Sequence, residues 1–188
     1  PEQVQDYLGK IALSSKHLLG LINDVLDISK IESGKMTLNI ERVSLRDVMD
    51  SIVNIIQPQV KAKNQQFHAV AYEILSEDVC CDSVRLNQVL INLLGNAVKF
   101  TPEQGTVQVA IYQEALPEDV SCVRTHFLVN DTGIGMSKEY QEKIFESFSR
   151  EDSTHVQKTE GSGLGMTITR YIVDVMGGTI SVSSEQGK

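Results

Sequence analysis

Cysteine, positive charge and long apolar runs are all scarce in this chain of 188 residues. Its three cysteines, Cys80, Cys81 and Cys122, are an odd number, which fits a reducing compartment rather than a disulfide framework. No stretch approaches the roughly 20 apolar residues that a membrane-spanning helix requires. No basic segment followed by an apolar core opens the chain, so we expect no signal peptide. The start at Pro1 and the end at Lys188 favour a piece of a longer protein, whose parent can still be anchored in a membrane.

The shortage of positive charge limits the possible partners. Lysine and arginine number 17 against 25 aspartates and glutamates, a net charge of −8 at pH 7. A nucleic-acid surface needs a basic stripe, so we expect no nucleic-acid partner. A phosphate site in this chain must supply its own positive charge, from backbone N–H groups, a metal ion and a few basic side chains. The four histidines have no cysteine or carboxylate partner at ligand spacing, which argues against a metal site built on histidine.

Apolar periodicity divides the chain into helices and strands. Residues 3–32 carry apolar side chains at the spacing of an amphipathic helix, which Ser33-Gly34 ends. That helix cannot bury its wide apolar face alone, so it needs partner helices. A second predicted helix can pass Pro58 only if it kinks. This second helix spans 44–64, and the remaining predicted helices are 82–100 and 164–176. The predicted strands are 35–43, 66–72, 106–114, 122–130 and 179–184.

These elements predict an α+β fold. We expect a two-layer sandwich of a mixed sheet and about three helices, preceded by one long helix. The domain boundary is predicted at Gly34–Met36, which separates residues 1–34 from residues 35–188.

One predicted helix carries two asparagines four residues apart. Asn92 and Asn96 project from one face together with Gln88 and Lys99, and the opposite face is apolar enough to pack on a sheet. Amide oxygens are hard, neutral ligands that suit magnesium, and a lysine adds a compact positive charge for phosphate groups. A polar helix face in water would explain the same residues. Asparagine is a mediocre helix former, however, so Asn92 and Asn96 in the middle of a helix favour a functional explanation.

Two glycine-rich turns follow the asparagine helix. Asp131–Gly135, with the sequence Asp-Thr-Gly-Ile-Gly, comes directly after a predicted strand. Its glycines permit positive φ and the close approach of a planar ligand, and its carboxylate can accept the amine of adenine. Gly161–Gly165, with the sequence Gly-Ser-Gly-Leu-Gly, opens a predicted helix whose free N–H groups can bind an anion. Taken alone, the first is equally an Asx turn and the second a flexible loop with hinges. Together with the asparagines they describe a pocket for a nucleoside triphosphate and its magnesium ion.

The segment between the turns has the composition of a lid. Phe145 and Phe148 could anchor it on the domain body, and Arg150 could reach a terminal phosphate. The polar run Glu151–Glu160 is expected to stay loose until ligand arrives. An amphipathic surface helix followed by a disordered loop explains the pattern equally well.

These motifs resemble those of the catalytic, ATP-binding domain of sensor histidine kinases. Its superfamily also holds DNA gyrase, mismatch-repair ATPases and the large heat-shock chaperones. The resemblance places the N box at Asp82–Thr101, the G1 box at Asp131–Gly135, the F box at Phe145–Phe148, the G2 box at Gly161–Gly165 and a glycine pair at Gly177-Gly178. Four boxes in this order, from about residue 35 onward, make the resemblance specific. It implies a Bergerat-type ATP-binding fold.

The resemblance also implies roles for particular residues. Asn96, helped by Asn92, would hold Mg²⁺, Asp131 would read adenine, and Lys99 and Arg150 would contact the phosphates. The implied nucleotide site consists of Asn92, Asn96, Lys99, Phe100, Asp131, Gly133, Gly135, Gly161, Gly163, Leu164 and Gly165, with ATP and Mg²⁺ as cofactors and Asn96, Lys99 and Arg150 as the catalytic group. A lid from about Met136 to Ser162 would become ordered when nucleotide binds.

Residues 6–34 resemble the second helix of the family's dimerisation and phosphotransfer hairpin. The first helix, which carries the phospho-accepting histidine, is not in this sequence, and His17 lies in the wrong helix without the acidic neighbour of that acceptor. The last strand, expected after Lys188, is also missing. The implied organisation is a partial hairpin at 1–34 and a catalytic domain at 35–188. The implied partners are a second copy, through the hairpin, and the receiver domain of a response regulator.

One position favours a kinase over an ATPase. The superfamily's ATPases carry a water-activating glutamate four residues before the metal-binding asparagine, where this chain has Asn92, which cannot act as a base. Phosphoryl transfer to a histidine needs positioning and charge stabilisation instead. We therefore expect the cytoplasmic catalytic module of a two-component sensor histidine kinase, which transfers the γ-phosphoryl of Mg-ATP to a histidine outside this fragment and cannot label itself. The alternatives are a nucleotide-sensing or scaffolding relative without phosphotransfer, and a serine-phosphorylating switch kinase.

Overall fold

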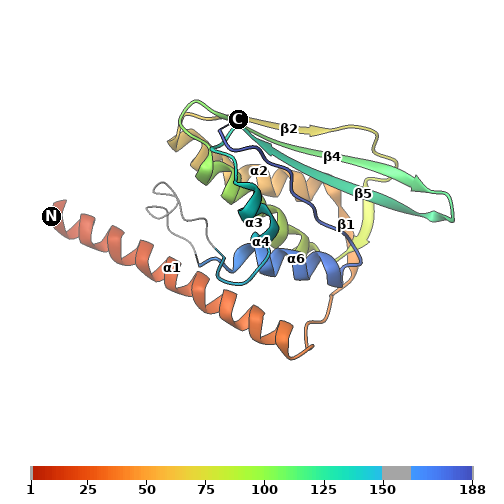
Figure 1. Ribbon diagram of the computed structural model, residues 1–188, viewed down its shortest axis with the longest axis horizontal. Coiled ribbons are helices and arrows are strands. Elements are labelled where there is room, and N and C mark those ends of the chain that lie inside the picture. The colour runs from red at the N-terminus through yellow and green to blue at the C-terminus, as the bar shows by residue number, and fades with distance from the viewer. Residues whose placement is uncertain (1, 150–161, 188) are drawn as a thin grey trace.

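The computed structural model describes residues 2–149 and 162–187 (Figure 1). The elements in chain order are α1 (Glu2–Glu32), β1 (Glu41–Ser44), α2 (Leu45–Ala62), β2 (Gln66–Ala71), β3 (Asp78–Cys81), α3 (Ser83–Phe100), β4 (Thr106–Leu116), β5 (Asp119–Asp131), α4 (Lys138–Lys143) and α6 (Gly165–Val175). The long leading helix and the α+β class are as predicted.

The main sheet has the order β2-β4-β5 and is mixed, because β2 pairs parallel to β4 and β4 pairs antiparallel to β5. The predicted hairpin of the two long strands is therefore confirmed. A separate two-stranded sheet joins β1 and β3, which run antiparallel. Helices α2 and α3 pack on one face of the main sheet, so the sandwich has the two expected layers (Figure 1).

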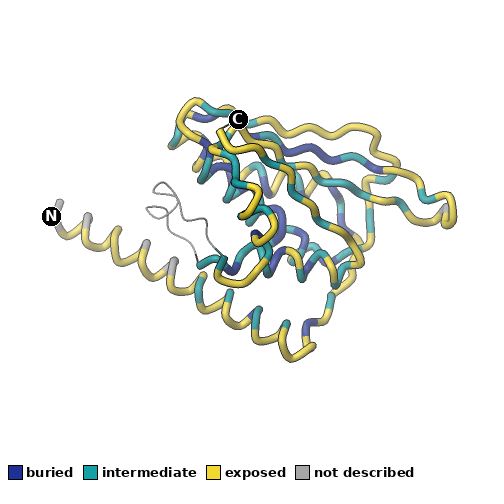
Figure 2. The backbone as a smooth tube through the Cα atoms, viewed as in Figure 1, coloured by how far each residue is buried: buried dark blue, intermediate teal, exposed yellow. Residues whose placement is uncertain are grey.

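The main core lies between that sheet face and the two helices. Val107, Val109 and Ile111 alternate along β4 and are at most 1% exposed. Ile52 and Leu94, from α2 and α3, are fully buried against them. Each such side chain contributes roughly 1.5–3 kcal/mol of transfer free energy. Figure 2 shows the buried residues concentrated in this layer, whereas α1 is almost entirely exposed.

Side-chain caps start α2 and α3 where the sequence predicts them. Ser44 accepts a hydrogen bond from the Asp47 N–H, and the buried Asp82 accepts from the N–H groups of Arg85 and Asn39. Burial raises the pKa of the Asp82 carboxyl, but these hydrogen bonds and the Arg85 charge outweigh it, so the pKa is lowered overall. Helix α2 continues through Pro58 to Ala62.

The strand predicted at 35–43 is wrong over residues 35–40, and only Glu41–Ser44 is a strand. Its partner β3 has four residues, so the ladder begins at the pair Glu41↔Cys81. Two residues earlier, the Asn39 N–H donates to the Asp82 carboxylate instead of a strand. The short strand β3 and the helix α4 were not predicted as elements.

The strand predicted at 179–184 is also wrong. Within the described residues this segment joins no ladder, and Thr179–Glu185 and β5 both line a cleft of about 1870 Å³. The segment is held by the lid side instead, where Gln141 Nε2 donates to the Ser184 carbonyl at 2.9 Å and the Met136 N–H donates to Ser184 Oγ at 3.0 Å.

The described contacts between helix α1 and the domain come from the C-terminal part of the helix. Ile28 and Ile31 pack with Met36 against the buried Ile168 and Ile172 of α6. Farther toward the N-terminus its apolar stripe is open to solvent, with Val4, Leu8, Ile11, Leu18 and Leu19 each about 60% exposed. Within the described residues, no helix combines the length and the apolar character needed to cross a membrane.

Candidate functional site

The wide cleft beside β5 collects most of the residues that the sequence singles out. Its lining includes Asn92, Asn96, Lys99, Phe100, Asp131, Gly135, Gly163 and Gly165. These residues come from the asparagine helix and from both glycine turns, so the structure brings together three segments that are separated in the chain. Gly161 and Arg150 lie outside the described residues.

The asparagine face of α3 packs directly on the start of α6. Asn92 Nδ2 donates to Thr169 Oγ1 at 2.7 Å, and Asn96 Nδ2 lies 3.5 Å from Met166 Sδ. A Cβ on Gly165 would lie 2.5 Å from Asn92 Oδ1, so only glycine lets the helix approach so closely. The asparagines therefore face a glycine-opened helix rather than open water.

Lys99 and Phe100 form the last turn of this helix. The Lys99 ammonium lies 4.8 Å from the centroid of the Phe100 ring, in cation–π range. The Phe100 carbonyl accepts a hydrogen bond from the Ile134 N–H at 3.3 Å, which ties the end of α3 to the first glycine turn, Asp131–Gly135.

The first glycine turn is held largely by main-chain contacts. The Gly133 N–H donates to Asp131 Oδ1 at 2.9 Å, so the alternative description as an Asx turn is also correct. Gly135 has φ +66, and a Cβ there would overlap the carbonyl of Glu185. The Ile134 carbonyl accepts from the Gly187 N–H at 2.9 Å.

The described part of the second glycine turn, Ser162–Gly165, has bonds through the Ser162 side chain and one main-chain bond to other described residues. Ser162 Oγ accepts from the Leu164 N–H at 3.2 Å and donates to Asp24 Oδ2 of α1 at 2.9 Å. Gly163 has φ +72, and its carbonyl accepts from the Phe148 N–H at 3.0 Å. The Leu164 side chain is 3% exposed and lies in the apolar cluster shared by α6 and α3, so only its main chain can serve a ligand.

The two phenylalanines of the lid behave differently. Phe145 lies under the guanidinium of Arg170, 5.2 Å from its ring centroid. Phe148 is 73% exposed with φ +62, so it does not anchor the lid on the domain body. What links Phe148 to the domain is its main chain.

A smaller cleft of about 420 Å³ opens on the other side of the asparagine face. Asp24 of α1, Asn92 and Asn96 of α3, and Gly165 and Thr169 of α6 line it. Sequence reasoning missed Asp24, Ser162, Met166 and Thr169. The only signal for Thr169 was a hydroxyl one turn after Gly165 in the predicted helix, and that for Asp24 was a carboxylate within an apolar stripe.

Two side chains that sequence reasoning missed fasten the C-terminal end of α3 from behind. Lys63 Nζ donates to the carbonyls of Val98, Lys99 and Thr101 at 2.8–2.9 Å. The amide of the buried Gln65 donates to the carbonyls of Val98 and Thr101 at 3.0 and 2.7 Å. We call Lys63 and Gln65 the clamp. It satisfies carbonyls that a helix end leaves open and thereby fixes the turn that carries Lys99 and Phe100.

The donor set suits a hard cation held with phosphate. Among the described residues, no group of three or more histidine, cysteine or carboxylate side chains is arranged to hold a metal by itself. Amide oxygens contribute no charge, so a cation there would have to share its coordination with an anionic ligand. The N–H groups at the start of α6 supply the complementary site for that anion.

Comparison with known proteins identifies the class. Residues 81–188, more than half of the chain, match the family described as "Histidine kinase-, DNA gyrase B-, and HSP90-like ATPase". The chain belongs to this family, whose members share an ATP-binding domain.

Individual relatives narrow the class to histidine kinases. The sensor histidine kinase GacS of Pseudomonas protegens is 37% identical over 188 residues, which is 100% of this chain and 20% of that protein. Full-length ShkA, solved in complex with AMPPNP, superposes with a TM-score of 0.80 at 30% identity over 98% of this chain and 36% of that one. The histidine kinase ThkA in complex with the response regulator TrrA matches at 22% identity and a TM-score of 0.61, over 87% of this chain and 43% of that one, which supports the fold.

The chain is thus the ATP-binding catalytic module of the sensor histidine kinase type. It spans about a fifth of the length of the curated relatives it matches.

Proposed function

We propose that this chain binds Mg-ATP in the wide cleft and serves phosphoryl transfer to a histidine that lies in another part of the parent protein. The observation that carries the proposal is the packing of the asparagine face on a glycine-opened helix, with Asn92 where a hydrolase needs a carboxylate base. An amide cannot activate water, so the site favours an incoming nucleophile that brings its own reactivity.

Asn96 and Asn92 would hold Mg²⁺ through their amide oxygens, and bound magnesium would neutralise charge on the phosphates. The donor type suits the ion, and the Asn92 amide oxygen faces the start of α6, where the Gly165 main chain approaches it without a side chain between them. Lys99 would add a fixed charge at the end of the same helix, and Arg150 is proposed to assist from the lid.

Asp131 and the first glycine turn would hold adenine. Asp131 ends β5 at the wall of the cleft, and its Oδ1 already accepts the Gly133 N–H, which orients the carboxylate. Gly133 and Gly135 would let the planar base lie close to the main chain. The second glycine turn would bind phosphate through N–H groups of Gly161, Gly163, Leu164 and Gly165.

The proposed organisation has residues 1–34 as part of a dimerisation hairpin and residues 35–188 as the catalytic domain. The exposed apolar stripe of α1 supports a homodimer through this helix, because such a stripe needs a partner. A receiver domain is the proposed acceptor of the signal, in line with the ThkA complex. The proposed location of the module is the cytoplasm, where ATP is available.

Calorimetric titration with a non-hydrolysable ATP analogue tests the nucleotide site. We expect binding that requires Mg²⁺ and that Asn96→Ala weakens about 10–100-fold, the usual effect of removing a metal-site side chain. Asn54→Ala, on the exposed face of α2, is the matched control and should bind like the unchanged chain. Equal affinities with and without Mg²⁺, or for both variants, would remove the metal role of Asn96.

Radiolabelled ATP tests the transfer step. This chain alone should take up no acid-labile label, whereas a parent chain with an acceptor histidine should. A chain that binds nucleotide while its complete parent never labels a histidine would support the alternative, a nucleotide-sensing relative without phosphotransfer.

A further inference from the structure

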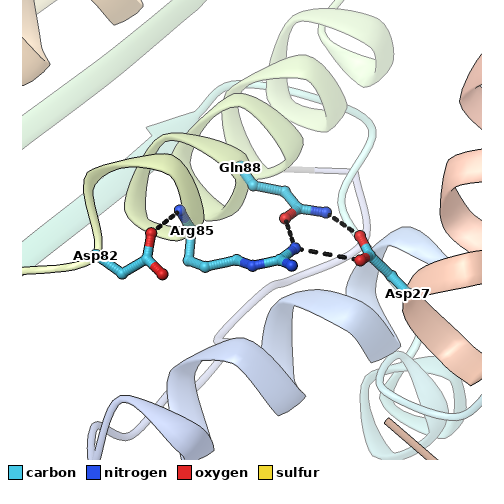
Figure 3. A network of polar contacts seen from close by, with 4 residues as sticks. All are labelled: Asp27, Asp82, Arg85 and Gln88. Atoms are coloured by element: carbon cyan, nitrogen blue, oxygen red, sulfur yellow. Dashed lines mark hydrogen bonds and ion pairs between the residues drawn. The ribbon is translucent and has the colours of Figure 1, made fainter. Parts of the chain in front are cut away.

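Helix α1 carries two carboxylates that reach the catalytic domain. Asp24 and Asp27 lie three residues apart, on the same side of the helix, and both make hydrogen bonds to residues more than fifty positions away. The contacts of Asp27 are shown in Figure 3.

Asp27 forms the inner contact. The residue is 8% exposed, and its carboxylate accepts from Arg85 Nη1 at 3.2 Å and from Gln88 Nε2 at 2.7 Å. Arg85 Nη1 also donates to Gln88 Oε1 at 2.7 Å, which closes a three-membered network at the start of α3 (Figure 3). A half-satisfied network of buried charges is unfavourable, so these groups either stay together or separate into water. The network therefore gives α1 a defined seat on the domain.

Asp24 forms the outer contact, one turn closer to the N-terminus. Its Oδ2 accepts from Ser162 Oγ at 2.9 Å, and the residue lines both clefts that border the asparagine face. Burial raises the pKa of this carboxyl, and the neighbouring charge of Asp27 adds to the effect, while the Ser162 hydrogen bond opposes it. The Asp24 carboxylate thus accepts the hydrogen bond of the Ser162 hydroxyl in the second glycine turn.

This position conflicts with a bound triphosphate. Under the proposed function, the same turn must present its donors to phosphate groups, which carry several negative charges. A carboxylate beside them repels a phosphate and competes for the Ser162 hydroxyl, and both effects grow in a partly buried cleft.

We propose that docked α1 restrains nucleotide binding, with Asp24 occupying the second glycine turn in place of phosphate and the Asp27–Arg85–Gln88 network holding the helix there. The inference rests on the proposed function of the site. Because coupling between two binding events is reciprocal, triphosphate binding then favours release of α1, and release of α1 favours triphosphate binding. The phosphotransfer helix and the nucleotide site would be linked through two aspartates.

The test compares charge-neutral variants in the full chain. Asp24→Asn removes the charge while keeping an acceptor for Ser162, and Asp27→Asn weakens the seat on Arg85. Asp50→Asn, on the exposed surface of α2, makes the same charge change elsewhere and is the matched control. Affinity for a non-hydrolysable ATP analogue with Mg²⁺ is measured by calorimetry, and amide hydrogen exchange is followed in the last turns of α1, with circular dichroism to verify folding.

We expect Asp24→Asn and Asp27→Asn to bind the analogue about 5–10-fold more tightly than the unchanged chain, the range of a modest allosteric coupling, and Asp50→Asn to show no change. The analogue should speed amide exchange in the last turns of α1 of the unchanged chain. Equal affinities of all variants that bind, with no change of exchange in α1, overturn the inference alone. Absence of binding to every chain overturns the proposed function together with it. Should Asp27→Asn fail to fold, Asp24→Asn decides the matter, since its contact is with a hydroxyl outside the core.

Discussion

The two glycine turns of the cleft are held in different ways. The first, Asp131–Gly135, is fixed by main-chain bonds to the end of α3 and to the C-terminal segment, and α3 is fastened there by the clamp. Among the described residues, the second, Ser162–Gly165, has one main-chain bond to Phe148 and two bonds through the Ser162 side chain, one of them to Asp24 of α1. Main-chain bonds to fixed elements leave few alternative arrangements, whereas side-chain bonds can be exchanged for bonds to a ligand. Under the proposed function, in which the first turn holds adenine and the second holds phosphate, this difference gives the site a preformed adenine end and an adjustable phosphate end.

The contacts of the asparagine face agree with this difference. The amide of Asn92 is engaged by Thr169, and that of Asn96 lies near a thioether, which is a weak acceptor. Neither contact belongs to the preformed end. Both can be given up when a cation and phosphates arrive, so predictions at the two ends should differ in size and in their response to nucleotide.

The largest effect is expected at the preformed end, from Gly135→Ala. The residue has φ +66, and an added Cβ would overlap the Glu185 carbonyl, so the variant suffers both backbone strain and a steric clash. We expect the free energy of unfolding to fall by about 3–5 kcal/mol and nucleotide binding to be lost. Chemical denaturation and calorimetric titration measure the two quantities.

Gly177→Ala is the control for strain alone. Gly177 has φ +75, but a Cβ there meets no atom within 4 Å. We expect the free energy of unfolding to fall by about 1–2 kcal/mol and nucleotide binding to be retained. If Gly135→Ala and Gly177→Ala lowered the free energy of unfolding by similar amounts, the first glycine turn would be able to adjust to an added Cβ. The difference between the two ends of the site would then disappear.

A smaller effect is expected from loosening the clamp. Lys63→Met keeps most of the apolar stem but removes the donor to three carbonyls at the end of α3. We expect the free energy of unfolding to fall by about 2 kcal/mol, because hydrogen bonds to a charged group are stronger than average and the Lys99 carbonyl loses this donor. The nucleotide affinity should also fall, since Lys99 and Phe100 belong to the released turn.

Lys61→Met provides the matched control. Lys61 is exposed and lies in the last turn of α2, two residues before Lys63. It should change stability by less than about 0.5 kcal/mol and leave nucleotide affinity as it is. A stability loss at Lys63 with unchanged affinity would show that the clamp supports the fold but does not position the site.

The four long helices and the motif residues could be predicted because their signals are local. Ser44 and Asp82 cap helices whose apolar stripes repeat at helical spacing, and the glycine turns lie directly beside a strand and a helix. The two wrongly predicted strands depended on pairing with distant segments, which local sequence does not reveal. Residues 35–40 alternate like a strand but have no partner of that length, and Ile180 and Val182 alternate in a segment that joins neither of the described sheets.

The missed site residues depend on contacts between distant segments. Ser162 and Asp24 are 138 positions apart, and Asn92 and Thr169 are 77 positions apart. No property of an isolated aspartate or threonine predicts such a partner. A carboxylate inside an apolar helix stripe was the available clue. It gained its meaning only when α1 was seen to lie along α6 (Figure 1), with Asp27 bonded to α3.

The smallest effect is expected at the adjustable end, from Thr169→Val. The change keeps the shape of a side chain that is 1% exposed but removes the acceptor of the Asn92 amide, so the nucleotide-free protein should lose about 1 kcal/mol. If Asn92 leaves Thr169 to serve the cation, that loss should vanish in saturating Mg²⁺ and ATP analogue, and the variant should bind the analogue up to about fivefold more tightly. Thr167→Val is the control in the same helix, because its buried hydroxyl has no hydrogen-bond partner among the described residues, and it should be neutral with or without nucleotide. Thermal unfolding of both variants, with and without the analogue, makes the measurement. An equal loss for Thr169→Val under both conditions would show that Asn92 keeps its bond to Thr169, and that the phosphate end is as rigid as the adenine end.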